Sequence, residues 1–203
     1  MTNFWNDRYS EEEYAYGTAP NEFFKSAIDT LPPGVILVPG AGEGRDAVYA
    51  AKLGWEVYAF DLSTEGRKKA LLLAEKENVD IHYEIRDAAD FPFSDAKFDA
   101  VAMIFFHLPA GLRQDFHKKL PDMLNPGGVI IIEAFNPIQI NNSSGGPREL
   151  SLLYTAEMLR GDFPNLNEII NSEYETELNE GLYHIGKADV VRYVGKLTNN
   201  LIA

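Results

Sequence analysis

The sequence predicts an α/β fold: a doubly wound, mostly parallel seven-stranded sheet that ends in an antiparallel C-terminal hairpin. Short apolar runs alternate with helical patterns between residues 35 and 134, and such alternation indicates parallel strands joined by helices. A glycine-rich turn follows the first of these runs, which is typical of a strand that leads directly into a helix. Two later strand patterns are joined by Glu180-Gly181, which predicts the hairpin.

The first strand, its turn, a helix and the second strand occupy residues 35–61. The first four residues are apolar without alternation, as expected for a strand covered on both faces. The turn Gly40-Ala41-Gly42-Glu43-Gly44 follows, and the second strand, Glu56 to Phe60, ends at Asp61. A helix of about nine residues climbs about 14 Å, and a strand of about five residues returns about 17 Å. Asp61 and the adjoining Leu62 are therefore expected beside the glycine turn.

This arrangement predicts a nucleoside-cofactor site formed by Gly40, Ala41, Gly42 and Asp61. A carboxylate beside such a turn can accept hydrogen bonds from the two hydroxyls of a ribose. A tight strand-to-helix turn without any ligand is the alternative, because glycines also serve turns. The joint occurrence of the glycines and the acid at this separation favours the cofactor site.

Charge and spacing distinguish between two cofactors. The dinucleotide fingerprint needs a third glycine at position 45, where the sequence has Arg45. Glu43 and Asp46 also place negative charge at the helix N-terminus, where a pyrophosphate would otherwise bind. S-adenosylmethionine carries no phosphate, and its sulfonium and ammonium groups tolerate nearby carboxylates. Its own carboxylate can be met by backbone N–H groups or by Arg45. We therefore predict S-adenosylmethionine.

The stretch 35–61 resembles motif I and the following acidic strand of class I S-adenosylmethionine-dependent methyltransferases. The opening W-x-x-R-Y, the pair Tyr16-Gly17 and the triplet Gly145-Gly146-Pro147 also resemble a branch of small bacterial methyltransferases grouped with tellurite-resistance and thiopurine-type enzymes. The resemblance covers nearly the whole chain and implies a Rossmann-like fold. One position departs from the family, because Val38 stands where an acidic residue usually helps to hold the amino end of the cofactor.

The resemblance also assigns residues to the adenine. In the family, an Asp just beyond the third strand accepts a hydrogen bond from the adenine amino group, and the next backbone N–H meets a ring nitrogen. Asp87 and Ala88 match that placement, because the third strand is expected at Ile81 to Ile85. The alternative for Asp87 is to cap a turn, although Asp90 could do that instead.

The fourth predicted strand, Phe98 to Phe106, is nearly all apolar and therefore central. Ile104 and Phe105 are expected at the same sheet edge as the glycine turn. Breakers at 32–34 and 125–128 end two helices, and the polar, glycine-rich stretch 139–148 predicts a long functional or mobile loop. The remaining helices are expected at 20–31, 63–78, 110–124 and from 155 to 160, and the remaining strands at 129–134, 173–179 and 184–193.

Residues 1–19 precede this core, which we expect to extend over 20–203 in a single domain. The segment carries four aromatics, Trp5, Tyr9, Tyr14 and Tyr16, more than a disordered leader would carry. Two interpretations stay open. The segment packs against the edge of the domain, or it forms a lid whose aromatic faces meet the sulfonium or the substrate. In the similar methyltransferase branch it covers the cofactor.

Methyl transfer is an in-line displacement at a carbon that the sulfonium has already activated, so alignment and exclusion of water matter most. A general base matters only for a nucleophile that arrives protonated. His107, at the end of the central strand, is the candidate base, with packing or hydrogen bonding as the alternative. His184, on a late strand, is expected to be structural. The pattern predicts a methyltransferase acting on a small molecule; the alternative is a non-catalytic cofactor-binding sensor or scaffold.

Composition limits the partners. The 203 residues carry a net charge of −13, which argues against nucleic acid or an anionic membrane as the main partner. The chain has no cysteine, which excludes disulfides and thiolate metal sites, and we expect no metal. No signal peptide or membrane span is visible. The expectation is a cytoplasmic protein, monomeric or homodimeric, with a small-molecule substrate.

Overall fold

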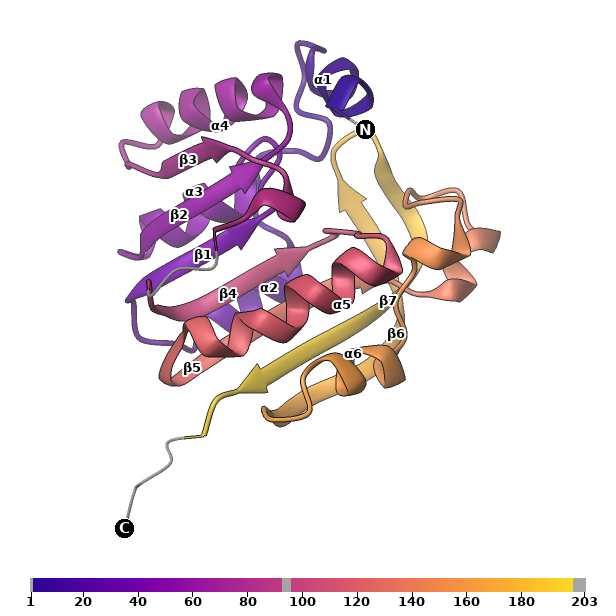
Figure 1. Ribbon diagram of the computed structural model, residues 1–203. Coiled ribbons are helices and arrows are strands. Elements are labelled where there is room, and N and C mark those ends of the chain that lie inside the picture. The colour runs from indigo at the N-terminus through magenta and orange to yellow at the C-terminus, as the bar shows by residue number, and fades with distance from the viewer. Residues whose placement is uncertain (1, 93–95, 199–203) are drawn as a thin grey trace.

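The computed structural model describes residues 2–92 and 96–198. Its centre is one seven-stranded sheet with the order β3-β2-β1-β4-β5-β7-β6 (Figure 1). The predicted fold class is therefore confirmed. The strands are β1 Val35–Pro39, β2 Glu56–Asp61, β3 His82–Ile85, β4 Phe98–Ile104, β5 Leu124–Phe135, β6 Asn167–Glu180 and β7 His184–Lys196.

Strands β1 to β5 run parallel, and β7 pairs antiparallel with both β5 and β6. Strand β1 lies between β2 and β4, so the strand order reverses at β1. In open α/β sheets, ligands bind outside the carboxyl ends of the strands at such a reversal. The glycine turn leaves β1 at that edge.

Helices cover both faces of the sheet (Figure 1). On one face, α2 Glu22–Ile28 and α3 Arg45–Lys52 contribute to a core that includes Ile36 and Val57. On the other face, α5 Ala110–Lys119 and α6 Ala156–Asp162 pack on a core that includes Val101 and Ile132. Helix α4 Thr64–Lys76 lies at the β3 end, and α1 Thr2–Tyr9 lies beside it, between α4 and the tip of the β6–β7 hairpin (Figure 1).

The helix expected at 110–124 is shorter than predicted. Helix α5 ends at Lys119 and continues as the 3-10 helix η2, Leu120–Met123. Pro121 lacks the N–H that an α-helix would use there, so the chain tightens instead. Strand β5 begins at Leu124 and includes the Asn-Pro-Gly-Gly breaker, with a register shift against β4.

The C-terminal hairpin is longer than its sequence pattern predicted. Strand β6 has 14 residues and β7 has 13. The apolar pattern did not predict the extra residues of β6, because this strand lies at the sheet edge and its side chains are mostly polar and exposed. The loop expected at 139–148 contains part of the 3-10 helix η3, Pro137–Asn141, and is followed by η4, Leu150–Leu152. Another short 3-10 helix, η1 Ala88–Asp90, follows β3.

Within the described part of the chain, no helix is long and apolar enough to span a bilayer.

Candidate functional site

The turn between β1 and α3 contains Gly40, Gly42 and Gly44, with φ angles of 64°, 52° and 85°. All three positions also lack room for a side chain, and a Cβ on Gly40 would lie 2.2 Å from the ring of Phe106. A Cβ on Gly42 would lie 2.7 Å from the Tyr9 hydroxyl, and a Cβ on Gly44 would lie 2.6 Å from the Cβ of Ala70. Backbone conformation and space therefore both require glycine here, and the bare turn lies directly under α1.

Asp61 ends β2 beside this turn. Its carboxylate accepts hydrogen bonds from the N–H of Gly42 at 3.1 Å and of Ser63 at 2.9 Å. The N–H of Ala41 donates to the carbonyl of the residue before Asp61, also at 3.1 Å. Burial raises the pKa of Asp61, and backbone hydrogen bonds, including one from Leu62, oppose that rise. The predicted juxtaposition of Asp61 with the glycine turn is confirmed.

The N-terminal segment covers the same edge. Tyr9, at the end of α1, is buried over Gly42, and its ring stacks on that of Trp5 with 5.6 Å between centroids. The Tyr16 ring follows, 6.4 Å from that of Tyr9. The Asn6 side-chain oxygen accepts a hydrogen bond from the Ser63 hydroxyl at 2.7 Å, which fixes α1 to the start of α4. Three of the four predicted aromatics therefore form one cluster, whereas Tyr14 donates from its hydroxyl to the carbonyl of Lys69 at 3.1 Å.

The carboxylates at the N-terminus of α3 bind this N-terminal segment. Glu43 accepts the N–H of Ala15 at 2.8 Å and pairs with Lys69 at 2.8 Å. Asp46 accepts the N–H of Asn21, also at 2.8 Å. Both carboxylates thus hold residues 15–21 in place. Because they are engaged in these contacts, they repel a pyrophosphate less strongly than the sequence alone indicated.

Arg45 points toward the N-terminal segment and the hairpin. Its guanidinium donates to the carbonyl of Tyr16 at 3.1 Å and pairs with Glu180 at 2.9 Å. The side chain is buried, and the nearby Asp46 and Glu180 carboxylates raise its pKa against the opposing effect of burial. Because the guanidinium is engaged in these contacts, backbone N–H groups are the better of the two partners predicted for the cofactor carboxylate.

Asp87 and Ala88 follow β3 on the same edge, where the N–H of the preceding Arg86 donates to the Asp61 carbonyl at 2.9 Å. The Asp87 side chain accepts the N–H of Ala89 at 2.9 Å and so caps η1. Ala88 is buried. The capping role that the sequence left open for Asp87 is present. The adenine contacts of both residues stay a prediction.

The chain leaves β4 through Ile104 and Phe105. Phe105 has a φ of 51°, which is uncommon for a bulky side chain and marks a strained position. Its N–H donates to the carbonyl of Glu133 at 2.7 Å, and its ring stacks on Phe135 with 4.5 Å between centroids. The neighbouring Phe106 ring lies against Gly40. The loop after β4 therefore adjoins the glycine turn, as predicted.

His107 has both ring nitrogens engaged. Nδ1 is 2.7 Å from the Leu152 carbonyl, and Nε2 is 3.3 Å from the N–H of Phe135. The first contact requires Nδ1 to donate and the second requires Nε2 to accept, so the ring is a neutral imidazole. Burial lowers the pKa of His107 to about 4. This arrangement fits the hydrogen-bonding alternative and leaves no free lone pair for a proton.

His184, expected to be structural, lies at this edge instead. Its ring is 4.4 Å from that of Tyr16 and 4.6 Å from that of Phe105, centroid to centroid. Nδ1 is 3.2 Å from a carboxylate oxygen of Glu180, its partner across the hairpin. The signal available in the sequence was the pair Glu180 and His184 flanking the predicted turn. A histidine on a late strand gave no reason by itself to place it here.

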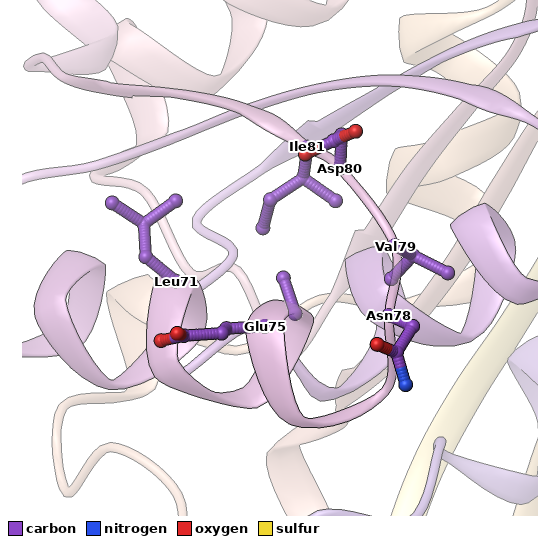
Figure 2. Close-up of a pocket in the computed structure, with 7 residues that line it drawn as sticks. Leu71, Glu75, Asn78, Val79, Asp80 and Ile81 are labelled. Carbon is purple, nitrogen blue, oxygen red and sulfur yellow. The ribbon is translucent and has the colours of Figure 1, made fainter.

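Two hollows lie away from the glycine turn. One, shown in Figure 2, lies between the end of α4 and the start of β3, at the opposite edge of the sheet from Asp61. The other lies under residues 16–22 and is lined by Glu133, Glu180 and Arg192, among others. The charges of these three residues are paired with one another or with Asn21. Neither hollow contains the predicted cofactor residues 40–42.

Comparison with known proteins gives a consistent result. Residues 36–128 match the family model described as a methyltransferase domain. Erythromycin 3''-O-methyltransferase of Saccharopolyspora erythraea is 30% identical over 127 residues, which cover 61% of this chain and 41% of that enzyme. The chain thus spans less than two thirds of the length of this relative.

Solved structures show the same fold. TehB from Haemophilus influenzae has a TM-score of 0.73 at 19% identity, covering 97% of this chain and 67% of its own. A second structure is described as showing conversion of a disulfide bond into a thioacetal group during echinomycin biosynthesis. Its TM-score is 0.77 at 19% identity, and the match covers 100% of this chain and 94% of that chain. The glycine turn, the strand-end acid and the terminal hairpin thus occur in a chain whose residues 36–128 match a methyltransferase-domain family and whose fold is that of S-adenosylmethionine-dependent methyltransferases.

Proposed function

We propose that this protein transfers a methyl group from S-adenosylmethionine to a small-molecule acceptor. The observation that carries the proposal is the hydrogen bond between the Asp61 carboxylate and the N–H of Gly42, covered by the ring of Tyr9. It joins an acid suited to binding a ribose to a glycine-rich turn at the carboxyl edge of a doubly wound sheet, where nucleoside cofactors bind.

The residues present fit the cofactor. Gly40 and Gly42 leave the turn bare, and the two oxygens of Asp61 have further acceptor capacity for ribose hydroxyls. When bound, S-adenosylmethionine supplies a methyl group activated by a sulfonium. The faces of Tyr9 and Tyr16 are suited to such a cation, and α1 keeps water away from the turn. These residues would bind and orient the cofactor.

The closely packed aromatic rings around His184 support a small-molecule acceptor. The centroids of the Tyr16, Phe105 and Phe135 rings each lie 4.4 to 5.3 Å from that of His184, which leaves little room for a macromolecular substrate. The net charge of −13 also disfavours a polyanionic acceptor such as nucleic acid. Alignment in a closed, dry site is the main requirement for methyl transfer.

The test is a turnover screen. Thiols, selenite, tellurite and small amines are offered with S-adenosylmethionine, and release of S-adenosylhomocysteine is measured. Turnover on any of them, lost in Asp61→Asn, is the expected result. Binding of S-adenosylhomocysteine without turnover on any acceptor would instead favour a non-catalytic binding protein. Failure to bind it at all would remove the cofactor assignment.

A further inference from the structure

His184 stands where an acceptor would meet the covered site. It begins β7, is only 5% exposed, and is enclosed by the rings of Tyr16, Phe105 and Phe135. Phe105 follows the central strand at the edge that bears the glycine turn, and Tyr16 belongs to the N-terminal cover. His184 is therefore a polar group inside an otherwise aromatic enclosure.

Glu180 fixes the orientation of this histidine. One of its oxygens accepts from Asn21 Nδ2 at 2.9 Å, and the other accepts from Arg45 at 2.9 Å and lies 3.2 Å from Nδ1 of His184. The Arg45 and His184 contacts hold the pKa of Glu180 at about 2 although burial opposes them. A permanent carboxylate requires Nδ1 to carry the hydrogen, so the lone pair of the neutral ring is on Nε2.

Nε2 is the ring nitrogen without a hydrogen bond: among the described residues, only Nδ1 of His184 has a partner. Gly145 lies against it with a φ of 122°, and a Cβ there would come within 3.1 Å of Nε2 and 2.6 Å of the ring carbon Cδ2. A side chain at position 145 would therefore press on this edge of the imidazole, and only glycine lets the backbone pass beside Nε2 without one.

We propose that His184 is the catalytic proton acceptor and that Glu180 is its positioning residue. The inference rests on the proposed function and names its acceptor class: a nucleophile that arrives protonated, such as a hydroxyl, thiol or selenol. The nucleophile's lone pair forms the bond to the methyl carbon as the sulfur–carbon bond breaks. The acceptor's proton passes to Nε2 and then to water. A thioether or tertiary amine, which has no such proton, gains nothing from this group.

The charges that face His184 come from four elements. Burial lowers the pKa of His184, Glu180 of β6 raises it, and Arg45 of α3 and Arg8 of α1 lower it further. His107, after β4, lies close enough for the two histidines to disfavour each other's protonated form. Because the net direction is downward, His184 is a neutral imidazole near pH 7, which is the form that can accept a proton.

Nitrogen-15 NMR of the ligand-free protein tests the positioning role without any turnover. Long-range couplings distinguish an Nδ1–H from an Nε2–H imidazole, and the exposed His82 provides a reference through His82→Gln. We expect wild-type His184 as the Nδ1–H tautomer. Glu180→Gln is expected to lower its pKa and to populate the other tautomer. A wild-type Nε2–H tautomer, or an unchanged titration in Glu180→Gln, would overturn the proposal, and the wild-type spectrum decides even if that variant does not fold.

Turnover then tests the catalytic role. His184→Gln is expected to lower kcat on a thiol, selenol or hydroxyl acceptor by about 10²- to 10⁴-fold, while S-adenosylhomocysteine affinity stays within about twofold and His82→Gln retains full activity. Methylation of thioethers or tertiary amines alone, or no turnover on any acceptor, would contradict the acceptor class. Cofactor binding measured alongside keeps that failure distinct from a failure of the methyltransferase assignment.

Discussion

The guanidinium of Arg8 lies 3.7 Å from the centre of the Tyr183 ring, and it donates a hydrogen bond to the hydroxyl of Tyr16 at 3.2 Å. This contact joins α1 to the tip of the β6–β7 hairpin. Beside it, the carbonyl of Ala15 accepts the N–H of Leu182 at 3.0 Å. Residues 2–16, which cover the glycine turn, are therefore attached to the β6–β7 hairpin. We expect the closed position of this segment to depend on the hairpin.

Arg8→Ala should weaken this attachment. A cation–π contact at a partly exposed site contributes about 0.5–1 kcal/mol, so affinity for S-adenosylhomocysteine should fall about two- to fivefold. Calorimetric titration measures the change, and Arg160→Ala, an exposed arginine paired with Glu168 on the far face, is the matched control. Equal affinities in both variants would show that the contact does not support the closed cover.

Deletion of residues 1–10 removes α1 and keeps Ala15, whose N–H satisfies the buried Glu43. Because the sheet begins only at Val35, the shortened protein should retain its circular dichroism spectrum. It should nevertheless bind S-adenosylhomocysteine at least about tenfold more weakly, because the aromatic cover over Gly42 is lost. Undiminished binding would reduce the segment to edge packing, the other interpretation that the sequence allowed.

Asp61→Asn should reduce cofactor affinity. The substitution removes a charge that accepts two backbone hydrogen bonds and would accept ribose hydroxyls, each worth about 1.5–3 kcal/mol when the acceptor is ionised. A loss of about 10- to 100-fold in S-adenosylhomocysteine affinity is expected. Asp99→Asn is the control, because Asp99 also accepts a backbone N–H, that of Val35, but at the opposite edge of the sheet. If Asp99→Asn alone weakened binding, the site would be at the wrong edge.

The free energy of unfolding should decrease between pH 6.5 and 4 because of His107. Its pKa of about 4 in the fold is below its value of about 6.5 in an unfolded chain. The unfolded state therefore binds more protons in this window, and stability is present above about pH 6.5 and lost as pH falls toward 4. Urea unfolding should show a loss of about 2 kcal/mol attributable to this residue. His107→Gln, which can keep both hydrogen bonds, should have a shallower pH dependence; the same slope in both would contradict the assignment.

Tyr154→Phe should loosen the loop after β4. The Tyr154 hydroxyl accepts the N–H of Leu108 at 2.6 Å and donates to the carbonyl of Phe106 at 3.2 Å. Its removal leaves a buried N–H without a partner, which costs about 1–3 kcal/mol. Tyr193→Phe removes a hydroxyl from an equally buried ring on β7, for which no hydrogen bond is found among the described residues, and is the control in chemical denaturation. Equal stabilities would mean that the loop does not depend on Tyr154.

The parallel half of the sheet and the site at its edge could be predicted because each local signal agrees with the global fold. The apolar sequence of β4 predicts a buried central strand, the glycines predict a tight turn, and Asp61 marks the end of the second strand. The path length of one helix and one strand then places Asp61 against Gly42, and the hydrogen bond is found.

The cover and the hairpin were less predictable because tertiary contacts determine them. Helix α1 has no apolar periodicity and is stabilised by Tyr9 over Gly42 and by Asn6 on Ser63. The Glu180-Gly181 turn predicted the pairing of β6 with β7, but the place of His184 beside Tyr16 and Phe105 depends on contacts between distant segments, which no local pattern encodes. The choice between His107 and His184 as the polar group of the site likewise required knowing which ring nitrogens are already bonded.

The central claim is that the edge formed by the glycine turn and Asp61 binds S-adenosylmethionine. Calorimetric titration of the wild-type protein with S-adenosylhomocysteine and, separately, with NAD tests it most directly. Saturable binding of S-adenosylhomocysteine with one site per chain is expected, with no binding of NAD at matched concentrations. Binding of NAD without binding of S-adenosylhomocysteine would contradict it.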